Sequence, residues 1–327
     1  MFESLLNDKP ILVIGRAGMD LYPDPAGTKT ENAGMFQAEL GGSSANIAVA
    51  LTRYHVPTSL LTCVSNDSVG RFVENQLTSY GVNTQLITRV SSDARTSLAV
   101  VESRVEDHQS VIYRNNAADF QMTQEHIRAV DMSEFKALVI TGTCLTLEPS
   151  RSASLLALKM AKAAGLITIM DLDYRPYSWS SSASAQRVYQ EAVDQVDVVV
   201  GNDEEFGHFA GDYSKGVEVA VRLASEGKCA VYKRGELGST TYLDDAQIDV
   251  PVYPVTPLKP TGAGDSFMGG LLAALCRGES LERSIHLGSA AAALVVTRVG
   301  CAPAMPDLDQ VVQFIAGHQL LSEKGES

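Results

Sequence analysis

Short apolar runs rich in β-branched residues alternate with stretches of helical periodicity along most of the chain. Six runs are apolar throughout, as strands of a parallel sheet covered on both faces are: 11–15, 59–64, 137–141, 167–171, 196–201 and 230–233. Helical patterns cover 43–54, 68–80, 149–164, 185–193 and 215–226. This alternation predicts a single α/β domain over residues 1–327, built on a doubly wound and mostly parallel sheet.

The pattern changes at three places. The runs 239–243 and 248–252 are short and adjacent, which favours antiparallel strands at one edge of the sheet, before helices at 264–276 and 281–297. Residues 19–40 are rich in Gly, Pro and Thr, and residues 96–114 hold two alternating runs, 97–102 and 110–113. We expect these two segments to form one small β-sheet that covers the site as a lid, although two surface loops would also fit the pattern.

Charge and cysteine content narrow the class of protein. The net charge of −13 disfavours nucleic acid as a partner, because an acidic chain repels the phosphate backbone. The five cysteines form no Cys-x-x-Cys pair and the six histidines no metal-binding pair. No signal-peptide core begins the chain, and the longest apolar stretch, 290–296, is too short to span a bilayer. We therefore expect a cytoplasmic protein without a membrane partner.

The segment Thr261-Gly262-Ala263-Gly264-Asp265 immediately precedes a helical run. Glycines before a helix let backbone amides converge on an anion at the positive helix end, here from Gly262 to Gly264. A carboxylate beside such a site does not attract phosphate, so Asp265 would serve as the base for an attacking hydroxyl. A helix N-cap would also explain the segment. No Walker P-loop or Gly-x-Gly-x-x-Gly fingerprint occurs, which disfavours a dinucleotide-dependent dehydrogenase.

A second candidate segment lies near the N-terminus. Gly41 and Gly42 would let a ligand approach the backbone, and Asn46 both donates and accepts hydrogen bonds, which suits a polyhydroxyl ligand. Asp20 follows the first strand, where open α/β sheets bind their ligands. A glycine turn with a serine cap and a solvated loop aspartate remain alternatives for these residues.

Four motifs together resemble those of the ribokinase-like, PfkB-type carbohydrate kinases, in the order of that family. They are Gly41–Asn46, Asn202-Asp-Glu-Glu205, Lys233-Arg-Gly235-Glu-Leu-Gly238 and Thr261–Asp265. The resemblance covers essentially the whole chain. It implies a doubly wound core with a β-sheet lid, ATP and Mg²⁺ as cofactors, and Asp265 as the catalytic base.

The resemblance also assigns the nucleotide side of the site. Asn202 and Glu205 match a motif linked indirectly to magnesium, and the expected ATP contacts are Lys233, Gly235, Gly238, Thr261, Gly262, Gly264 and Ser289. One position departs from the family, whose members often have an aspartate two residues before the signature threonine. That aspartate belongs to a loop that binds a monovalent cation in several relatives. Here Lys259 stands in its place, so we expect no dependence on potassium.

Other segments resemble segments of those family members that act on sugar acids. The run Asp171-Leu-Asp173-Tyr-Arg175 is similar to their Asp-x-Asn-x-Arg segment, with Asp173 replacing asparagine, and Tyr113-Arg114 to a lid element of different spacing. Residues 15–23 and 298–306 look most like members acting on 5-dehydro-2-deoxygluconate in myo-inositol breakdown. Arginines suit a carboxylate, which they can bind with two donors. We expect Arg114 to bind it, with Arg175 and Arg16 as further candidates.

Two alternatives stay open at this point. One is a kinase of the same family for 2-keto-3-deoxygluconate, fructose, ribose or a nucleoside. The other is a sugar-binding regulator without activity, because a fold does not fix a function. We also expect a homodimer formed through the lid.

Overall fold

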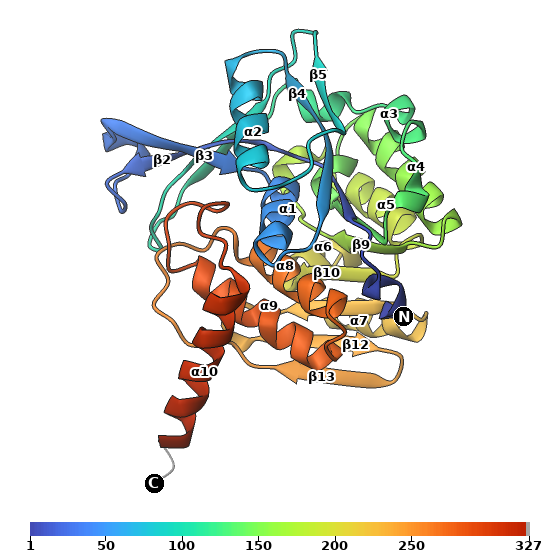
Figure 1. The fold of residues 1–327 in the computed structure, drawn as a ribbon, viewed down its shortest axis with the longest axis vertical. Helices are drawn as coiled ribbons and strands as arrows, with labels where there is room; N and C mark the ends of the chain where they lie inside the picture. The colour runs from blue at the N-terminus through green and yellow to red at the C-terminus, as the bar shows by residue number, and fades with distance from the viewer. Residues whose placement is uncertain (325–327) are drawn as a thin grey trace.

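Nine strands form the larger sheet of the computed structural model, which describes residues 1–324 (Figure 1). Their order is β13-β12-β11-β10-β9-β8-β1-β4-β5, and neighbouring strands pair in parallel except at β12, which runs antiparallel to both β11 and β13. The strands span Ile11–Ile14 (β1), Thr58–Ser65 (β4), Ile87–Val90 (β5), Ala137–Thr141 (β8), Ile167–Asp171 (β9), Val198–Asn202 (β10), Cys229–Lys233 (β11), Ser239–Leu243 (β12) and Ala246–Val250 (β13). The predicted α/β class with a mostly parallel sheet is confirmed.

Helices cover both faces of this sheet, because successive strand residues point to opposite sides. In β1, Ile11 and Val13 pack into one apolar core, and Leu12 and Ile14 pack into the other. The first core is covered by α1 (Ser43–Arg53), α2 (Ser68–Ser79), α8 (Ala263–Cys276), α9 (Leu281–Val295) and α10 (Leu308–Lys324). The second is covered by α3 (Gln124–Arg128), α4 (Ser150–Ala163), α5 (Ser182–Val193), α6 (Asp203–Ala210) and α7 (Gly216–Ser225). None of the helices in the described part of the chain is long and apolar enough to cross a bilayer.

Four strands form a smaller sheet, in the order β3-β2-β6-β7. They span Gly18–Asp24 (β2), Met35–Gly41 (β3), Ser97–Val101 (β6) and Ser110–Tyr113 (β7). Strand β2 pairs antiparallel with β3 and parallel with β6, so the segments 19–40 and 96–114 do join in one sheet. Figure 1 shows β2 and β3 projecting from the body of the molecule. Whether this sheet closes over a ligand stays a prediction.

The order of the larger sheet determines where a ligand can enter. Strand β1 lies between β4 and β8, so the chain is wound in one direction from β1 to β5 and in the other from β8 to β11. The loops after β1 and β8 therefore leave the sheet toward opposite faces. In open α/β sheets this point, beyond the carboxyl ends of the strands, is where ligands bind.

Candidate active site

The loops that carry the expected site residues meet at this end of the larger sheet. Arg16 follows β1 by two residues, and β9, β10 and β11 end at Asp171, Asn202 and Lys233. Helices α1 and α8 begin at the same end, since Asn46 in the first turn of α1 donates a hydrogen bond to Asp265 in the first turn of α8. Residues from the whole length of the chain therefore surround one site.

The segment before α8 has the geometry of an anion-binding loop. Gly262 is the N-cap of α8 with a left-handed φ of 85°, and no side chain of residues 1–324 caps this helix end. A side chain at Gly262 would also lie 3.1 Å from the buried Sγ of Cys301, so glycine is required there. The first amides of an α-helix have no partner within the helix. Those of Ala263, Gly264 and Asp265 can therefore bind phosphate oxygens.

Asp265 is held next to this loop by Asn46, whose Nδ2 donates to its Oδ2 at 2.8 Å. Burial raises the pKa of Asp265 to about 8, and the negative charges of Asp173 and Asp171 act in the same direction. The hydrogen bond from Asn46 and the charge of Arg175 lower the pKa, without cancelling the effect of burial. A carboxyl group that titrates near neutral pH is well matched to accepting and returning a proton.

Gly41 and Gly42 are required by the packing of the strands next to them. A Cβ on Gly41 would lie 1.9 Å from Oδ1 of Asp20, and a Cβ on Gly42 would lie 2.5 Å from the carbonyl oxygen of Arg16. Gly42 also adopts a φ of 101°, which side chains disfavour. The two glycines therefore bring β2, the loop after β1 and the start of α1 into direct contact.

Three buried oxygen atoms at the site lack a hydrogen-bond partner among the described residues. They are Oδ1 of Asp20, Oδ1 of Asn46 and Oγ1 of Thr261. Burial also raises the pKa of Asp20. Because buried polar atoms are normally satisfied, these atoms indicate where ligand hydroxyl groups would bind.

The three expected arginines differ in their partners. Arg114 donates to the carboxylate of Asp119 and to the carbonyl oxygen of Thr143, and its guanidinium lies 4.0 Å from the ring centre of Phe120. Arg175 pairs with Asp173 at 2.7 Å. The buried Arg16 donates to Oγ of Ser97 at 3.1 Å.

Asn202 and Glu205 form a capping box at the start of α6, in which each side chain accepts from the backbone amide of the other residue. Glu205 is nevertheless part of the buried charge cluster of the site. Burial and the charge of Asp171 raise the pKa of Glu205 to about 7, while Lys233 lowers it. For Lys233, burial lowers the pKa, but Asp171 and Glu205 outweigh this and raise it.

This cluster fits a magnesium ion that arrives with a nucleotide. In residues 1–324 no three His, Cys, Asp or Glu side chains are grouped as metal ligands. Mg²⁺ does not need such a cage, since it usually keeps several waters and binds one or two carboxylates together with substrate phosphates. Glu205 and Asp171 can supply those carboxylates, directly or through water.

Three of the remaining predicted nucleotide contacts, Gly235, Gly238 and Ser289, follow Lys233 in the chain. Gly235 and Gly238 have φ values of 54° and 82° in the turn between β11 and β12. A Cβ on Gly238 would lie 2.2 Å from the carbonyl oxygen of Val250, so this glycine serves the packing of β13 as well. Ser289 on α9 is buried and donates to the carbonyl oxygen of Pro251. The contacts of these residues with ATP stay predictions.

The family model of pfkB carbohydrate kinases matches residues 8–308, which include every strand of both sheets. The chain belongs to the pfkB family of carbohydrate kinases. It is therefore an ATP-dependent phosphotransferase that acts on an alcohol group.

Named relatives agree with this assignment. The 5-dehydro-2-deoxygluconokinase of Photobacterium profundum is 36% identical over 320 residues, which cover 95% of this chain and 97% of that protein. A structure of the fructokinase from Xylella fastidiosa with bound ATP has a TM-score of 0.83 and 25% identity, over 96% of this chain and 100% of that one. A double mutant of the fructokinase from Vibrio cholerae O395, with fructose, ADP and potassium ion bound, has the same TM-score and identity over 94% and 98%.

A buried polar cluster behind the anion loop of this kinase was only partly expected. Lys259 is fully buried, and its Nζ donates to the carbonyl oxygen of Thr261 at 2.5 Å. The hydroxyl group of Tyr22 lies 3.3 Å from both Oδ2 of Asp20 and Sγ of Cys301, and so links the smaller sheet to the loop after α9. The sequence indicated the position of Lys259, but no sequence pattern indicated that Tyr22 and Cys301 are in contact.

Asp173 also makes contacts that the sequence did not predict. Its Oδ2 accepts hydrogen bonds from Ser43, at 2.6 Å, and from Thr143, at 3.3 Å. Ser43 belongs to the glycine motif and could have been singled out, whereas nothing in the sequence marks Thr143. These contacts fix the Asp173 carboxylate beside the start of α1.

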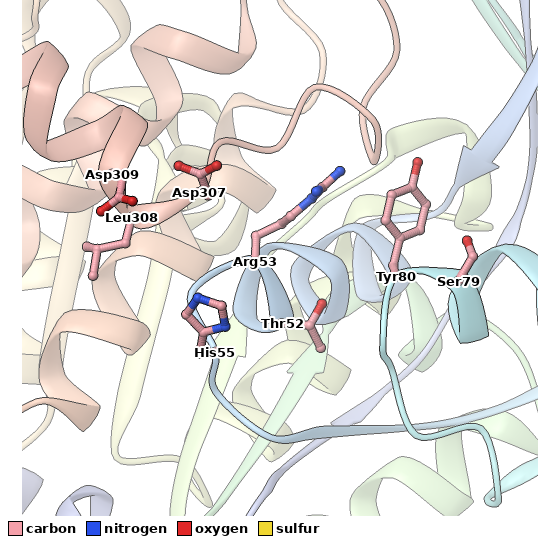
Figure 2. Close-up of a pocket in the computed structure, with 8 residues that line it drawn as sticks. All are labelled: Thr52, Arg53, His55, Ser79, Tyr80, Asp307, Leu308 and Asp309. Carbon is pink, nitrogen blue, oxygen red and sulfur yellow. The ribbon is translucent and has the colours of Figure 1, made fainter.

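A separate cavity of about 470 Å³ lies at the other end of α1 (Figure 2). Figure 2 shows Arg53 between Tyr80 and Asp307, and the guanidinium lies 5.2 Å from the ring centre of Tyr80. None of the expected site residues lines this cavity; its lining is Thr52, Arg53, His55, Ser79, Tyr80, Asp307, Leu308 and Asp309. Because α1 separates it from Asn46, it is not part of the candidate active site.

Proposed function

We propose that this kinase transfers the γ-phosphoryl group of ATP to the primary hydroxyl of 5-dehydro-2-deoxygluconate, in the breakdown of myo-inositol. The observation that carries the proposal is that Asp265, a protonatable base, lies beside the uncapped N-terminus of α8 and accepts a hydrogen bond from Asn46. We call the part of the site around Asp20 and Asn46, where the sugar would bind, the sugar end. The name of the Photobacterium profundum relative supports the substrate. A sugar end with Asp20 and three arginines, Arg16, Arg114 and Arg175, suits an acid that carries hydroxyl groups.

In the proposed reaction Asp265 takes the proton of the primary hydroxyl as the hydroxyl oxygen attacks the γ-phosphorus; the bond from the γ-phosphorus to the β–γ bridging oxygen breaks, and ADP leaves. Asn46 orients the carboxylate through the bond to Oδ2. The amides of residues 262–264, with that of Asp265 in the first turn of α8, bind the oxygens of the group in transfer, where negative charge is concentrated. Asp20 and Gly42 hold the sugar over the ends of the strands. Closure of the smaller sheet would exclude water, which otherwise competes as acceptor.

Lys233 and the turn at Gly235 and Gly238 would bind the nucleotide. Thr261 and Ser289 would contact it at the edge of the nucleotide site. Mg²⁺, held through Glu205 and Asp171, would offset the charge of the phosphates, and Asn202 would act indirectly by fixing Glu205 in the capping box. Lys233 lies next to the anion loop, because a Cβ on Gly264 would be 3.2 Å from its Nζ. A cation beside this loop supports the proposal that Lys233 binds the phosphates of ATP.

Lys259 takes the place of a bound monovalent cation in this proposal. Its ammonium group is buried and hydrogen-bonded to the backbone of the anion loop, near Asp20 and Asp265. A fixed charge at this point would stabilise the loop as a bound ion would. The fructokinase of Vibrio cholerae, by contrast, has a structure with potassium ion bound.

A homodimer through the smaller sheet is the assembly we propose. Met35 and Phe36 on β3 are 64% and 42% exposed, and Val111 and Tyr113 on β7 are 49% and 60% exposed. Both strands are edges of the sheet with unpaired backbone groups. Covering exposed apolar side chains and open edges would stabilise a dimer.

Two assays test this function. Single-turnover transfer from labelled ATP to 5-dehydro-2-deoxygluconate separates a kinase from a sugar-binding regulator, which would bind without transfer. Steady-state ADP release then compares the sugar acid with fructose. We expect a higher kcat/KM for the acid; a preference for fructose would leave only the family assignment.

A further inference from the structure

Arg16 is the one arginine of the sugar end whose guanidinium has no carboxylate within ion-pair distance among residues 1–324. Arg114 is satisfied by Asp119, and Arg175 by Asp173. Arg16 is only 8% exposed, yet its guanidinium has a single hydrogen bond in the described chain, to Oγ of Ser97. A buried cation without a charged partner is costly, which indicates that its partner is a ligand.

The position of Arg16 follows from its neighbours. Its carbonyl oxygen accepts from the amide of Ala45 at 3.2 Å and lies against Gly42, which fixes its backbone at the start of α1. Its guanidinium lies over Gly18, where a Cβ would be 3.1 Å from its Nη1. Gly18 and Ser97 are paired at the beginning of β2 and β6. The charged group thus lies where the smaller sheet meets the larger one.

Asp20 lies on β2, two residues beyond Gly18. It lies near Arg16, because a Cβ on Gly41 would be 1.9 Å from Oδ1 of Asp20 and a Cβ on the adjacent Gly42 would be 2.5 Å from the carbonyl oxygen of Arg16. The positive charge of Arg16 accordingly lowers the pKa of Asp20 against the larger, raising effect of burial. They form no ion pair, however, and Oδ1 of Asp20 is buried without a partner in the described chain. A cation and an anion that are both buried and both incompletely bonded fit a ligand that reaches each of them. Such a ligand has a carboxylate for Arg16 and a hydroxyl group for Asp20, and is a hydroxy acid.

We infer that Arg16 binds the carboxylate of the acceptor sugar and thereby determines the preference of this kinase for a sugar acid. Two guanidinium donors can face the two carboxylate oxygens, while Ser97 orients the guanidinium from behind. The remaining arginines then have other functions: Arg114 ties β7 to the body of the protein through Asp119, and Arg175 stays with Asp173. This inference rests on the proposed function, because it assigns one residue to its substrate.

The test uses two substrates of nearly the same shape, 5-dehydro-2-deoxygluconate and its C1 amide, of which only the acid is charged at C1. In Arg16→Gln we expect kcat/KM for the acid to fall about 10–150-fold, and for the amide to stay within about threefold. Arg16→Lys keeps the charge without the two-donor geometry and should lose less. Ser97→Ala should give a smaller loss that is again confined to the acid.

Arg114→Gln and Arg175→Gln are the matched comparisons, with melting temperatures measured for all variants. An equal loss for acid and amide in Arg16→Gln would overturn the inference, as would an acid-selective loss in Arg114→Gln or Arg175→Gln instead. If Arg16→Gln does not fold, Arg16→Lys and Ser97→Ala replace it in the test: a loss of kcat/KM confined to the acid supports the inference, and an equal loss for acid and amide overturns it. A wild-type enzyme that phosphorylates neither acid nor amide contradicts the proposed function itself, which is a different outcome.

Discussion

Replacement of Asp265 by asparagine should inactivate the enzyme and make it more stable. The carboxylate is buried and its pKa is raised from 3.8 to about 8, so the folded state holds a proton that the unfolded state releases between these values. The folding stability that this group contributes is therefore full below pH 4 and is lost as pH rises toward 8. Asparagine keeps the acceptor for Asn46 and does not titrate.

The size of the stability difference between the two proteins follows from the pKa shift of Asp265. Each pH unit inside this window changes the free energy of unfolding by at most about 1.4 kcal/mol. Between pH 5 and pH 8 the advantage of Asp265→Asn over the wild type should therefore grow by about 3 to 4 kcal/mol. Glu205 and Asp171 also have raised pKa values, but they are present in both proteins and largely cancel in the difference.

Urea unfolding at four pH values measures this difference, with fluorescence of the single tryptophan, Trp179, as the signal. Turnover is measured on the same samples, and loss of the base should reduce kcat about 10²–10⁴-fold while ATP and sugar still bind. In the wild type, kcat/KM should increase with pH up to about 8, since only the ionised carboxylate accepts a proton. Near-normal turnover of Asp265→Asn, or a stability difference that does not change with pH, would refute the reasoning.

Three further predictions concern the metal, the cation and the assembly. Glu205→Gln should raise the Mg²⁺ concentration for half-maximal activity about 10–100-fold, measured by Mg²⁺ titration at saturating ATP, and an unchanged Mg²⁺ requirement would exclude Glu205 from metal binding. Added potassium should not stimulate turnover in sodium-free buffer because Lys259 supplies the charge, and a stimulation of about tenfold would show that it does not. Phe36→Glu should convert the dimer to a monomer in light scattering, whereas the control Val217→Glu, equally exposed on α7, should remain dimeric; a wild-type monomer contradicts the assembly.

The buried strands of the larger sheet could be predicted to within two residues from the sequence. Ala137–Thr141 and Ile167–Asp171 have the predicted bounds, because a strand covered on both faces must be apolar throughout. Strand β3 gave no such signal, since most of its residues, including Met35 and Phe36, are exposed. Helices α6 and α10 were also not predicted; α6 has only 8 residues and opens with three acidic ones.

The contacts within the candidate site were less predictable from the sequence than the strands. The chemistry of Asp265 and Asn46 could be proposed from their motifs, but their contact joins residues 219 positions apart and depends on α1 and α8 starting at one end of the sheet. The partners of the arginines could not be predicted either. Whether Arg114 faces a ligand or Asp119 is decided by the orientation of β7, which no local pattern encodes.

One competition experiment tests the central claim, that this is a sugar-acid kinase, most directly. The enzyme receives MgATP and an equimolar mixture of 5-dehydro-2-deoxygluconate, 2-keto-3-deoxygluconate, fructose and ribose, and mass spectrometry follows each phosphate ester. The ratio of initial rates in such a mixture equals the ratio of the kcat/KM values. The account predicts that the ester of 5-dehydro-2-deoxygluconate accumulates first and fastest. Faster phosphorylation of fructose or ribose would contradict it.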